Sequence, residues 1–257
     1  MPACRVPWVP WAPSAEPLAQ CPAGTTRIRP SPTVEHAISV DPATLAPTRH
    51  IDSDHPAIRA FTAEHAADLP PREAAVALYY AVRDGLRYNP WRVRFRREDY
   101  LASEVLGRDR SEGGHCIDKA LLLAACARAA GIPARVHFAT VRNHIGTARL
   151  EQALGTDLLV YHGYSELFLD GRWVAATPAF NRELCEKLGV APLEFDGVRD
   201  SIFQAYDRKG GAFMEYVADH GSHVDLPFDA MIAEWRAKYP RLAELGGRWP
   251  TPEEGAR

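Results

Sequence analysis

Several signals of specialised protein classes are missing from this sequence of 257 residues. The five cysteines form no C-x-x-C pair, which excludes a zinc ribbon, and their odd number argues against a disulfide framework. No stretch approaches the roughly 18 consecutive apolar residues of a membrane span. Basic residues number 30 against 33 acidic ones, so there is no excess positive charge to neutralise phosphates. We therefore expect neither a membrane nor a nucleic-acid partner.

The first part of the chain also lacks a secretory pattern. Residues 1–17 have no charged start followed by a continuous apolar run, which favours a cytoplasmic protein. Eight of the 21 prolines fall within residues 1–32. Because proline restricts φ and has no backbone donor, this stretch is predicted to be a flexible extension. A single domain is expected over 33–245, followed by a polar tail over 246–257.

Hydrophobic periodicity predicts a mixed fold. Helices are predicted over 52–68, 72–87, 99–106, 116–130, 184–188 and 228–239, and strands over 135–141, 161–169 and 172–176. Asp170-Gly171 is a hairpin turn signal between the last two strands. The helix that starts at Cys116 is apolar on almost every side, so we expect it to be buried. This order predicts an α+β fold in which N-terminal helices and a buried helix pack on an antiparallel sheet.

The sharpest local feature is the run Gly113-Gly114-His115-Cys116, which opens the buried helix. The positive end of the helix dipole and the free backbone N–H groups favour a thiolate at Cys116. Two glycines allow a substrate to approach the backbone closely, and the Cys116 N–H could donate to an oxyanion. The alternative for Cys116 alone is a small buried apolar residue, which is the expected role of Cys126.

A thiol nucleophile needs a base, and His162 is the candidate. It lies on the first strand of the predicted hairpin. A histidine in this position can equally be a core residue with satisfied hydrogen bonds. The pair is informative because both residues occur within a larger set of ordered motifs.

That set resembles the transglutaminase-like superfamily of papain-related cysteine enzymes, and in particular its bacterial transglutaminase-like domain proteins. The segments that carry the resemblance are 113–116, 130–135, 162–167 and 170–174, within a region of about 68–181. The resemblance implies a papain-like core with a Cys-His-Asp triad in which Cys116 is the nucleophile and His162 the base. It implies no cofactor, and the sequence has no calcium-binding loop motif.

One position departs from the family pattern. After the tryptophan of the returning strand the family usually has Asp-Pro, whereas this chain has Thr177-Pro178. Asn181 follows shortly, and an amide carbonyl can orient an imidazole as in the Cys-His-Asn enzymes. We predict Asn181 as the third member, with Thr177 as the alternative. The missing carboxylate also allows a catalytically decayed site.

Four further residues are candidates for the walls of a substrate cleft, namely Gly114, His115, Trp91 and Tyr164. Tyr164 would share the strand face of His162 if the alternation is regular. The run from His220 to His223 is predicted to be a surface loop, and no metal site is predicted.

The sequence thus predicts an enzyme that performs thiol-dependent acyl chemistry on a peptide, a protein or a small amide. Water as the second nucleophile would make it a peptidase or amidase, and an amine would make it an acyltransferase. The sequence leaves both open. The alternative is a decayed transglutaminase-like fold that binds peptides or proteins without catalysis.

Overall fold

The computed structural model describes residues 40–143, 148–202, 214–245 and 249–252. The predicted extension over 1–32 lies outside these residues, as does most of the predicted tail. The helices are α1 (Pro56–Ala66), α2 (Pro71–Gly85), α3 (Ala102–Leu106), α4 (Cys116–Ala129), α5 (Ala148–Leu154), α6 (Arg182–Leu188), α7 (Phe228–Lys238) and α8 (Arg241–Glu244). Two 3-10 helices, η1 (Pro42–Thr44) and η2 (Arg97–Tyr100), and four strands, β1 (Ala134–Asn143), β2 (Leu158–Leu169), β3 (Arg172–Ala176) and β4 (Met214–His223), complete the described elements.

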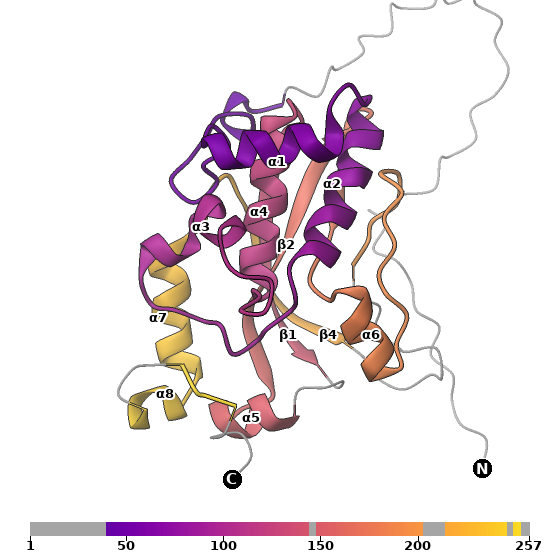
Figure 1. Cartoon of the computed structure of the whole chain (residues 1–257). Coiled ribbons are helices and arrows are strands. Elements are labelled where there is room, and N and C mark those ends of the chain that lie inside the picture. Colours follow the sequence, from indigo (N-terminus) through magenta and orange to yellow (C-terminus); the bar gives the residue numbers. More distant parts are fainter. Residues whose placement is uncertain (1–39, 144–147, 203–213, 246–248, 253–257) are drawn as a thin grey trace, which may run out of the picture. The chain divides into compact units, whose positions relative to one another are not determined.

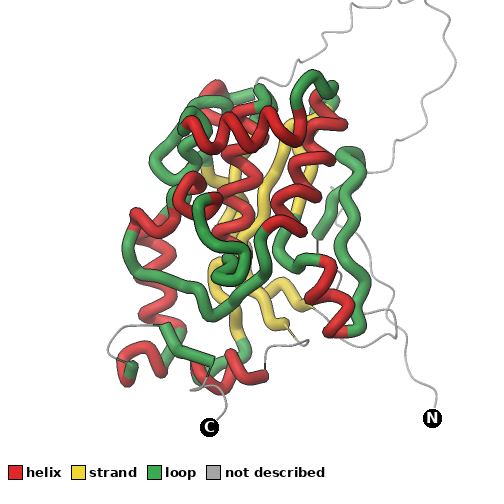
Figure 2. The backbone as a smooth tube through the Cα atoms, viewed as in Figure 1, coloured by secondary structure: helices red, strands yellow, loops and turns green. Residues whose placement is uncertain are grey.

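The predicted α+β class is confirmed. The four strands form one antiparallel sheet in the order β3-β2-β1-β4. Helices α1, α2 and α4 lie in front of the strands in the view of Figures 1 and 2. The predicted hairpin is present as β2 and β3, and Asp170 and Gly171 both have positive φ angles at its turn. No helix among the described residues is long and apolar enough to cross a bilayer.

Helix α4 is the centre of the core. Every residue from Ile117 to Arg128 is buried, as the nearly continuous apolar sequence predicted. The helix packs against α2 and against strands β1 and β2. It ends as predicted, because Gly131 takes a φ of +77° and the chain turns away there.

A buried lysine ties α4 to the end of α2. Lys119 Nζ donates to the carbonyl oxygens of Arg83 and Leu86 at 2.8 and 2.7 Å. These carbonyls belong to the last turn of α2 and the residue that follows it, where helix carbonyls otherwise lack partners. Burial lowers the pKa of Lys119 to about 7. The start of α4 is therefore held close to the segment that leaves α2.

The first helix is shorter than predicted. It begins at Pro56 rather than at Asp52, because His55 caps it through a hydrogen bond from the Ala57 N–H to its Nδ1 atom. Proline suits the first helical position, where its missing N–H costs nothing. Asp52 instead accepts the N–H of Ser103 at 3.1 Å. The helix predicted over 99–106 is likewise divided into η2 and α3.

Strand β4 was not predicted, and the loop predicted around His220 is wrong. His220 and His223 both belong to β4, which pairs with β1. Two register shifts interrupt that pairing, and Gly221 has a φ of +79°. Such bulges break the two-residue alternation by which a strand is recognised in a sequence. Helix α5 was also missed.

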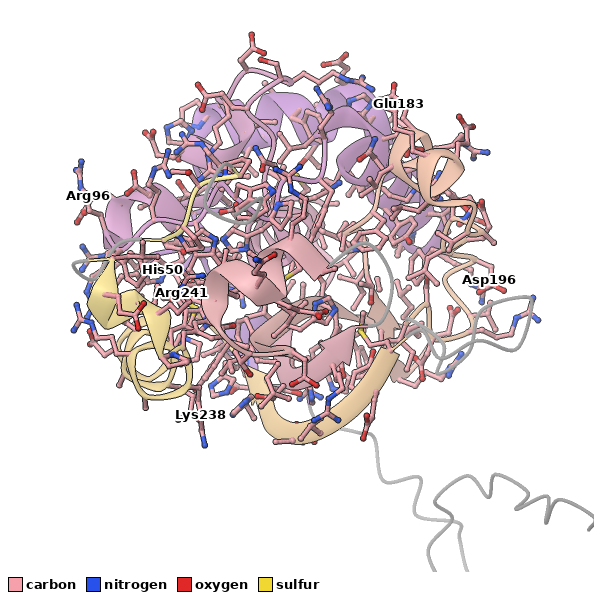
Figure 3. All side chains as sticks on the ribbon, turned by 90° about the horizontal axis from the view of Figure 1, so that it is seen from below. His50, Arg96, Glu183, Asp196, Lys238 and Arg241 are labelled. Atoms are coloured by element: carbon pink, nitrogen blue, oxygen red, sulfur yellow. The ribbon has the colours of Figure 1, made fainter. Side chains whose placement is uncertain are left out.

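Charged side chains lie mainly on the outside of the described domain. Figure 3 shows Arg96, Asp196 and Lys238 extending away from the ribbon, and all three are exposed. The pattern is that of an ordinary folded domain whose apolar interior is formed by α4 and the sheet.

Candidate functional site

Cys116 is the first residue of α4, as predicted, and the cap before it is well defined. The Asp118 carboxylate accepts the His115 N–H at 2.9 Å, while His115 Nδ1 accepts the Ile117 N–H at 3.2 Å. This reciprocal arrangement is a capping box in which histidine takes the usual place of serine or threonine. Arg108 Nη1 lies 2.9 Å from Asp118 Oδ2 and compensates the buried carboxylate. The start of the helix, and with it the thiol, is thereby fixed.

The two glycines before the cap let this turn lie against the segment that follows α2. Gly114 forms a bridge with Tyr88: its N–H donates to Arg87 O, and its carbonyl accepts the Asn89 N–H, both at 2.9 Å. Gly113 has a φ of +68°, and a Cβ atom there would lie 2.4 Å from Arg87 O. Glycine is therefore required at position 113 for both reasons.

His162 follows a bulge in β2. Its pairing partner on β1 is Ala139, whereas Leu159 pairs with Val141, so β2 has an extra residue between them. Tyr161 has a φ of +61°, a left-handed conformation that is strained for an aromatic residue. Because the alternation is interrupted here, the four consecutive residues from Leu159 to His162 all line one pocket.

The ring of Tyr161 is held from two neighbouring strands. It stacks on His220 of β4 with ring centroids 4.3 Å apart and lies 5.5 Å from the ring of Phe138 on β1. His220 is itself fixed by a 2.8 Å hydrogen bond between its Nε2 and Thr140 Oγ1. These contacts compensate the backbone strain next to His162.

The structure brings Cys116 and His162 together. Both line a pocket of about 40 Å³ in which His115 and Tyr88 also take part. Strand β2 lies close to α4 at this point, since a Cβ atom on Gly163 would lie 3.3 Å from Ile117 Cα. Hydrogen bonding by backbone N–H groups, with that of Gly163 the strongest, favours the thiolate at the sulfur.

The effect of burial on the pKa of the Cys116 thiol is nevertheless larger than the effect of these donors. Cys116 packs against both hydrophobic clusters of the domain, and burial raises the pKa of its thiol to about 11. Burial, and next the nearby His115, lower the pKa of His162 to about 4. At neutral pH the pair therefore rests as thiol and neutral imidazole. The thiolate predicted from the helix dipole is wrong for this state, because desolvation is the larger effect.

The raised pKa gives a testable pH dependence. Only the thiolate reacts with iodoacetamide, so we expect the alkylation rate of Cys116 to rise about tenfold per pH unit from pH 7 to about 10. A pre-formed thiolate and imidazolium pair would instead give a nearly constant rate from pH 5 to 8. Peptide mapping by mass spectrometry measures the rate, with the buried Cys126 as the internal reference. A plateau at neutral pH would contradict the neutral pair.

The two candidates for the third member are not among the residues that line this pocket. Asn181 caps α6; its Oδ1 accepts the Tyr88 N–H at 3.0 Å, and its Nδ2 lies 3.5 Å from Glu183 Oε2. Thr177 binds through its backbone, donating to Ser201 O and accepting from the Tyr79 hydroxyl. Within the described residues, the buried Thr177 Oγ1 has no hydrogen-bond partner.

Not all of the other residues predicted for the cleft walls line the pocket. His115 lines the pocket, whereas Gly114 shapes the turn behind it. Trp91 packs on the core, outside the lining. Tyr164 also lies outside the lining, because its ring stacks on His137 at 4.8 Å.

Sequence reasoning missed the aromatic residues that the C-terminal part contributes. Trp235 on α7 and Tyr239 directly after that helix line the pocket, and so does Trp249 from the segment predicted as a polar tail. The aromatic residues of α7 were visible in its amphipathic pattern, but nothing in the sequence placed them beside Cys116. No group of three or more metal-binding side chains is found in the described part of the chain.

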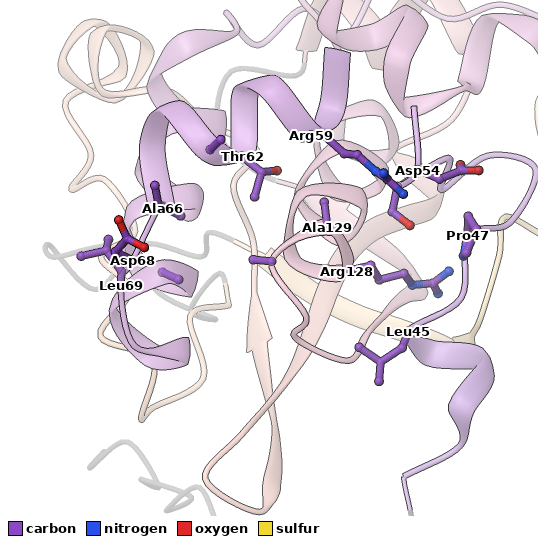
Figure 4. Close-up of a pocket in the computed structure, with 15 residues that line it drawn as sticks. Leu45, Pro47, Asp54, Arg59, Thr62, Ala66, Asp68, Leu69, Arg128 and Ala129 are labelled. Atoms are coloured by element: carbon purple, nitrogen blue, oxygen red, sulfur yellow. The ribbon is translucent and has the colours of Figure 1, made fainter. Parts of the chain in front are cut away.

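A larger pocket, of about 630 Å³, lies at the other end of α4 (Figure 4). Its lining includes Arg59 and Asp68 and, at the end of α4, Arg128. The Arg128 guanidinium donates to the carbonyls of Ala46, Ala134 and Val224. With a rise of 1.5 Å per residue this pocket is about 20 Å from Cys116. It contains no thiol, so we do not assign the chemistry to it.

Comparison with known protein families gives one match, over the central part of the chain. Residues 59–178 match the model of the transglutaminase-like superfamily. A crystal structure from Cytophaga hutchinsonii, named as a "Putative Cysteine Protease", is similar with 17% sequence identity and a TM-score of 0.41. That match covers 75% of this chain and 57% of the other, so this chain spans less than two thirds of that structure. A comparison with curated proteins found no match.

Proposed function

We propose that this chain, whose residues 59–178 belong to the transglutaminase-like superfamily, performs thiol-dependent acyl chemistry on an amide. The observation that carries the proposal is the shared pocket of Cys116, at the start of the buried helix, and His162, on the neighbouring strand. Substrates of this chemistry are peptides, proteins or small amides.

The steps follow from the neutral pair. As the Cys116 sulfur attacks the carbonyl carbon, His162 takes the thiol proton, and a C–S bond forms while the carbonyl oxygen becomes an oxyanion. The Cys116 N–H is the donor proposed for that oxyanion, since the His115 and Ile117 N–H groups are used in the cap. The C–N bond then breaks, His162 protonates the leaving amine, and a thioester remains on Cys116. Water or a second amine, deprotonated by His162, displaces the thiol and releases the acid or a new amide.

The low pKa of the buried His162 makes the first step demanding. With a pKa of about 4, protonating His162 at pH 7 costs about 4 kcal/mol. Proton transfer must therefore accompany the formation of the C–S bond rather than precede it. We propose Asn181 as the residue that orients the imidazole, because its Oδ1 accepts the N–H of Tyr88, which lines the pocket. Thr177 is the alternative.

A second function is favoured by one observation, the threonine in place of the family's aspartate at position 177. In this alternative the domain binds a peptide or protein through the same pocket without forming a covalent intermediate. The neutral resting state of the pair is compatible with both functions.

The test is direct detection of the acyl-enzyme. The full chain is incubated with a panel of p-nitrophenyl esters and peptide amides, quenched in acid, and analysed by intact mass and peptide mapping. We expect one acyl group per chain, on the peptide that contains Cys116. An adduct on another residue, or binding without any adduct across the panel, would contradict the catalytic proposal. Adding an excess of a primary amine distinguishes transfer from hydrolysis, because transfer yields a new amide.

A further inference from the structure

The pocket beside Cys116 is apolar except for the site residues themselves. Its remaining lining comes from five parts of the chain: Tyr88, Pro90 and Val93; Ile117; Leu150; Leu159, Val160 and Tyr161; and Trp235, Tyr239 and Trp249. No aspartate, glutamate, lysine or arginine is among the lining residues. Burial raises the pKa of Tyr88 and of Tyr239, so both phenols are neutral at physiological pH.

The polar atoms of the two tryptophans and of Tyr239 are already hydrogen-bonded to the backbone. Trp235 Nε1 donates to Val160 O at 2.8 Å, and the Tyr239 hydroxyl accepts the Val160 N–H at 2.8 Å. Trp249 Nε1 donates to Pro90 O at 3.0 Å. The rings therefore offer carbon surface to an occupant. A charged group placed here would lose its hydration without gaining an oppositely charged Asp, Glu, Lys or Arg partner from the lining, which is unfavourable.

The free space is small. A volume of about 40 Å³ holds a few water-sized groups, which is enough for a methyl or a short alkyl group and too little for an aromatic ring. Trp249 forms one of its walls, with its ring centroid 5.3 Å from Trp235 and 5.4 Å from Tyr239. A second contact holds the segment that carries Trp249: the Pro252 carbonyl accepts a hydrogen bond from Arg149 Nη2 at 2.7 Å.

We infer that this pocket receives the side chain next to the attacked carbonyl, that this side chain is small and uncharged, and that Trp249 sets its upper size. The inference rests on the proposed function of Cys116 as the nucleophile. It assigns a substrate class to the site, namely amides whose acyl part carries a small aliphatic group. It also assigns a selectivity role to a residue outside the matched family region of 59–178.

The experiment uses N-acetyl chloromethyl ketones of alanine, phenylalanine and aspartate on the full chain. In each reaction the Cys116 sulfur forms a bond to the methylene carbon, the C–Cl bond breaks, chloride leaves and the thiol proton passes through His162 to solvent. Second-order labelling rates are measured by peptide mapping. We expect the alanine reagent to react at least tenfold faster than the phenylalanine reagent, and the aspartate reagent to be slowest.

Replacing Trp249 is the decisive variant. In Trp249→Ala, the phenylalanine reagent is expected to gain at least tenfold relative to the alanine reagent, while the aspartate reagent stays slow. Trp173→Ala is the matched control, because Trp173 lies on β3, where its ring packs under the Arg135 guanidinium, and it does not line the pocket. That variant should keep the wild-type order. If Trp249→Ala does not fold, Trp249→Leu and the wild-type order of the three reagents still decide the question.

Iodoacetamide has no side chain to place in the pocket. Its reaction therefore tests Cys116 as the nucleophile separately from the apolar subsite. If Cys116 fails to react with it above pH 9, the nucleophile itself is wrong. If Cys116 reacts with iodoacetamide but labels equally fast with the alanine and aspartate reagents, the proposed function survives and the small apolar subsite is overturned.

Discussion

Replacing Cys116 with alanine is expected to abolish acyl-enzyme formation, and replacing His162 with glutamine to slow it about a thousandfold. Glutamine keeps much of the volume and polarity of histidine but cannot accept the thiol proton. Since the thiol rests protonated, with a pKa of about 11, loss of the base leaves only the rare spontaneous thiolate to react. Stopped-flow release of p-nitrophenol under single-turnover conditions measures the acylation rate.

The pH profile distinguishes a base from a structural residue. The His162→Gln variant should regain rate as the pH rises, because hydroxide then generates the thiolate, whereas a misfolded site would not recover. Cys126→Ala is the control for removing a thiol from the same helix. A rate for His162→Gln within tenfold of the wild type at neutral pH would mean that His162 is not the base.

The same assay decides between the two candidates for the third position. Asn181→Ala removes the amide that also accepts the Tyr88 N–H. Thr177→Val removes only the hydroxyl and keeps the shape of the side chain. The residue that orients the imidazole is the one whose loss lowers the acylation rate at neutral pH and leaves the high-pH rate unchanged.

The second large effect is expected at Gly113, where alanine should lower the free energy of unfolding by about 2–4 kcal/mol. The left-handed φ of +68° accounts for part of this loss. The rest arises because a Cβ atom would lie 2.4 Å from Arg87 O, so the turn before Cys116 has to separate from the neighbouring segment. Urea denaturation followed by circular dichroism measures the change.

Gly131→Ala measures the conformational part alone, so the difference between the two variants gives the steric part at Gly113. Gly131 also has a positive φ, of +77°, but no atom lies within 4 Å of its added Cβ. We expect a loss of about 1 kcal/mol there, from the backbone conformation alone. Equal losses at the two positions would show that the contact with Arg87 is unimportant.

Much of the fold around Cys116 could be predicted, because local signals agree there. The two glycines, the apolar run and the terminal Gly131 each indicate a buried helix that starts at the cysteine, and the structure has that helix. The Asp170-Gly171 turn similarly fixed the β2–β3 hairpin. These features depend on neighbours in the sequence, so periodicity and turn chemistry are sufficient to find them.

The remaining features depend on contacts between distant segments. The bulged pairing of β4 hides its alternation, and the position of Trp249 beside Cys116 has no local signature. The protonation state of the thiol was predicted in the wrong direction for the same reason. A helix terminus can be recognised in a sequence. The desolvation that raises the pKa of Cys116 arises only in the folded chain, where Cys116 packs against both hydrophobic clusters.

The stacking of His220 on Tyr161 has a consequence for the evolution of this domain. His220 lies on the edge strand β4 and outside the pocket lining, yet it supports the unusual backbone that precedes His162. Substitutions on β4 would therefore alter the position of the His162 imidazole. Residues 140, 161 and 220 should change together rather than independently among descendants of this sequence.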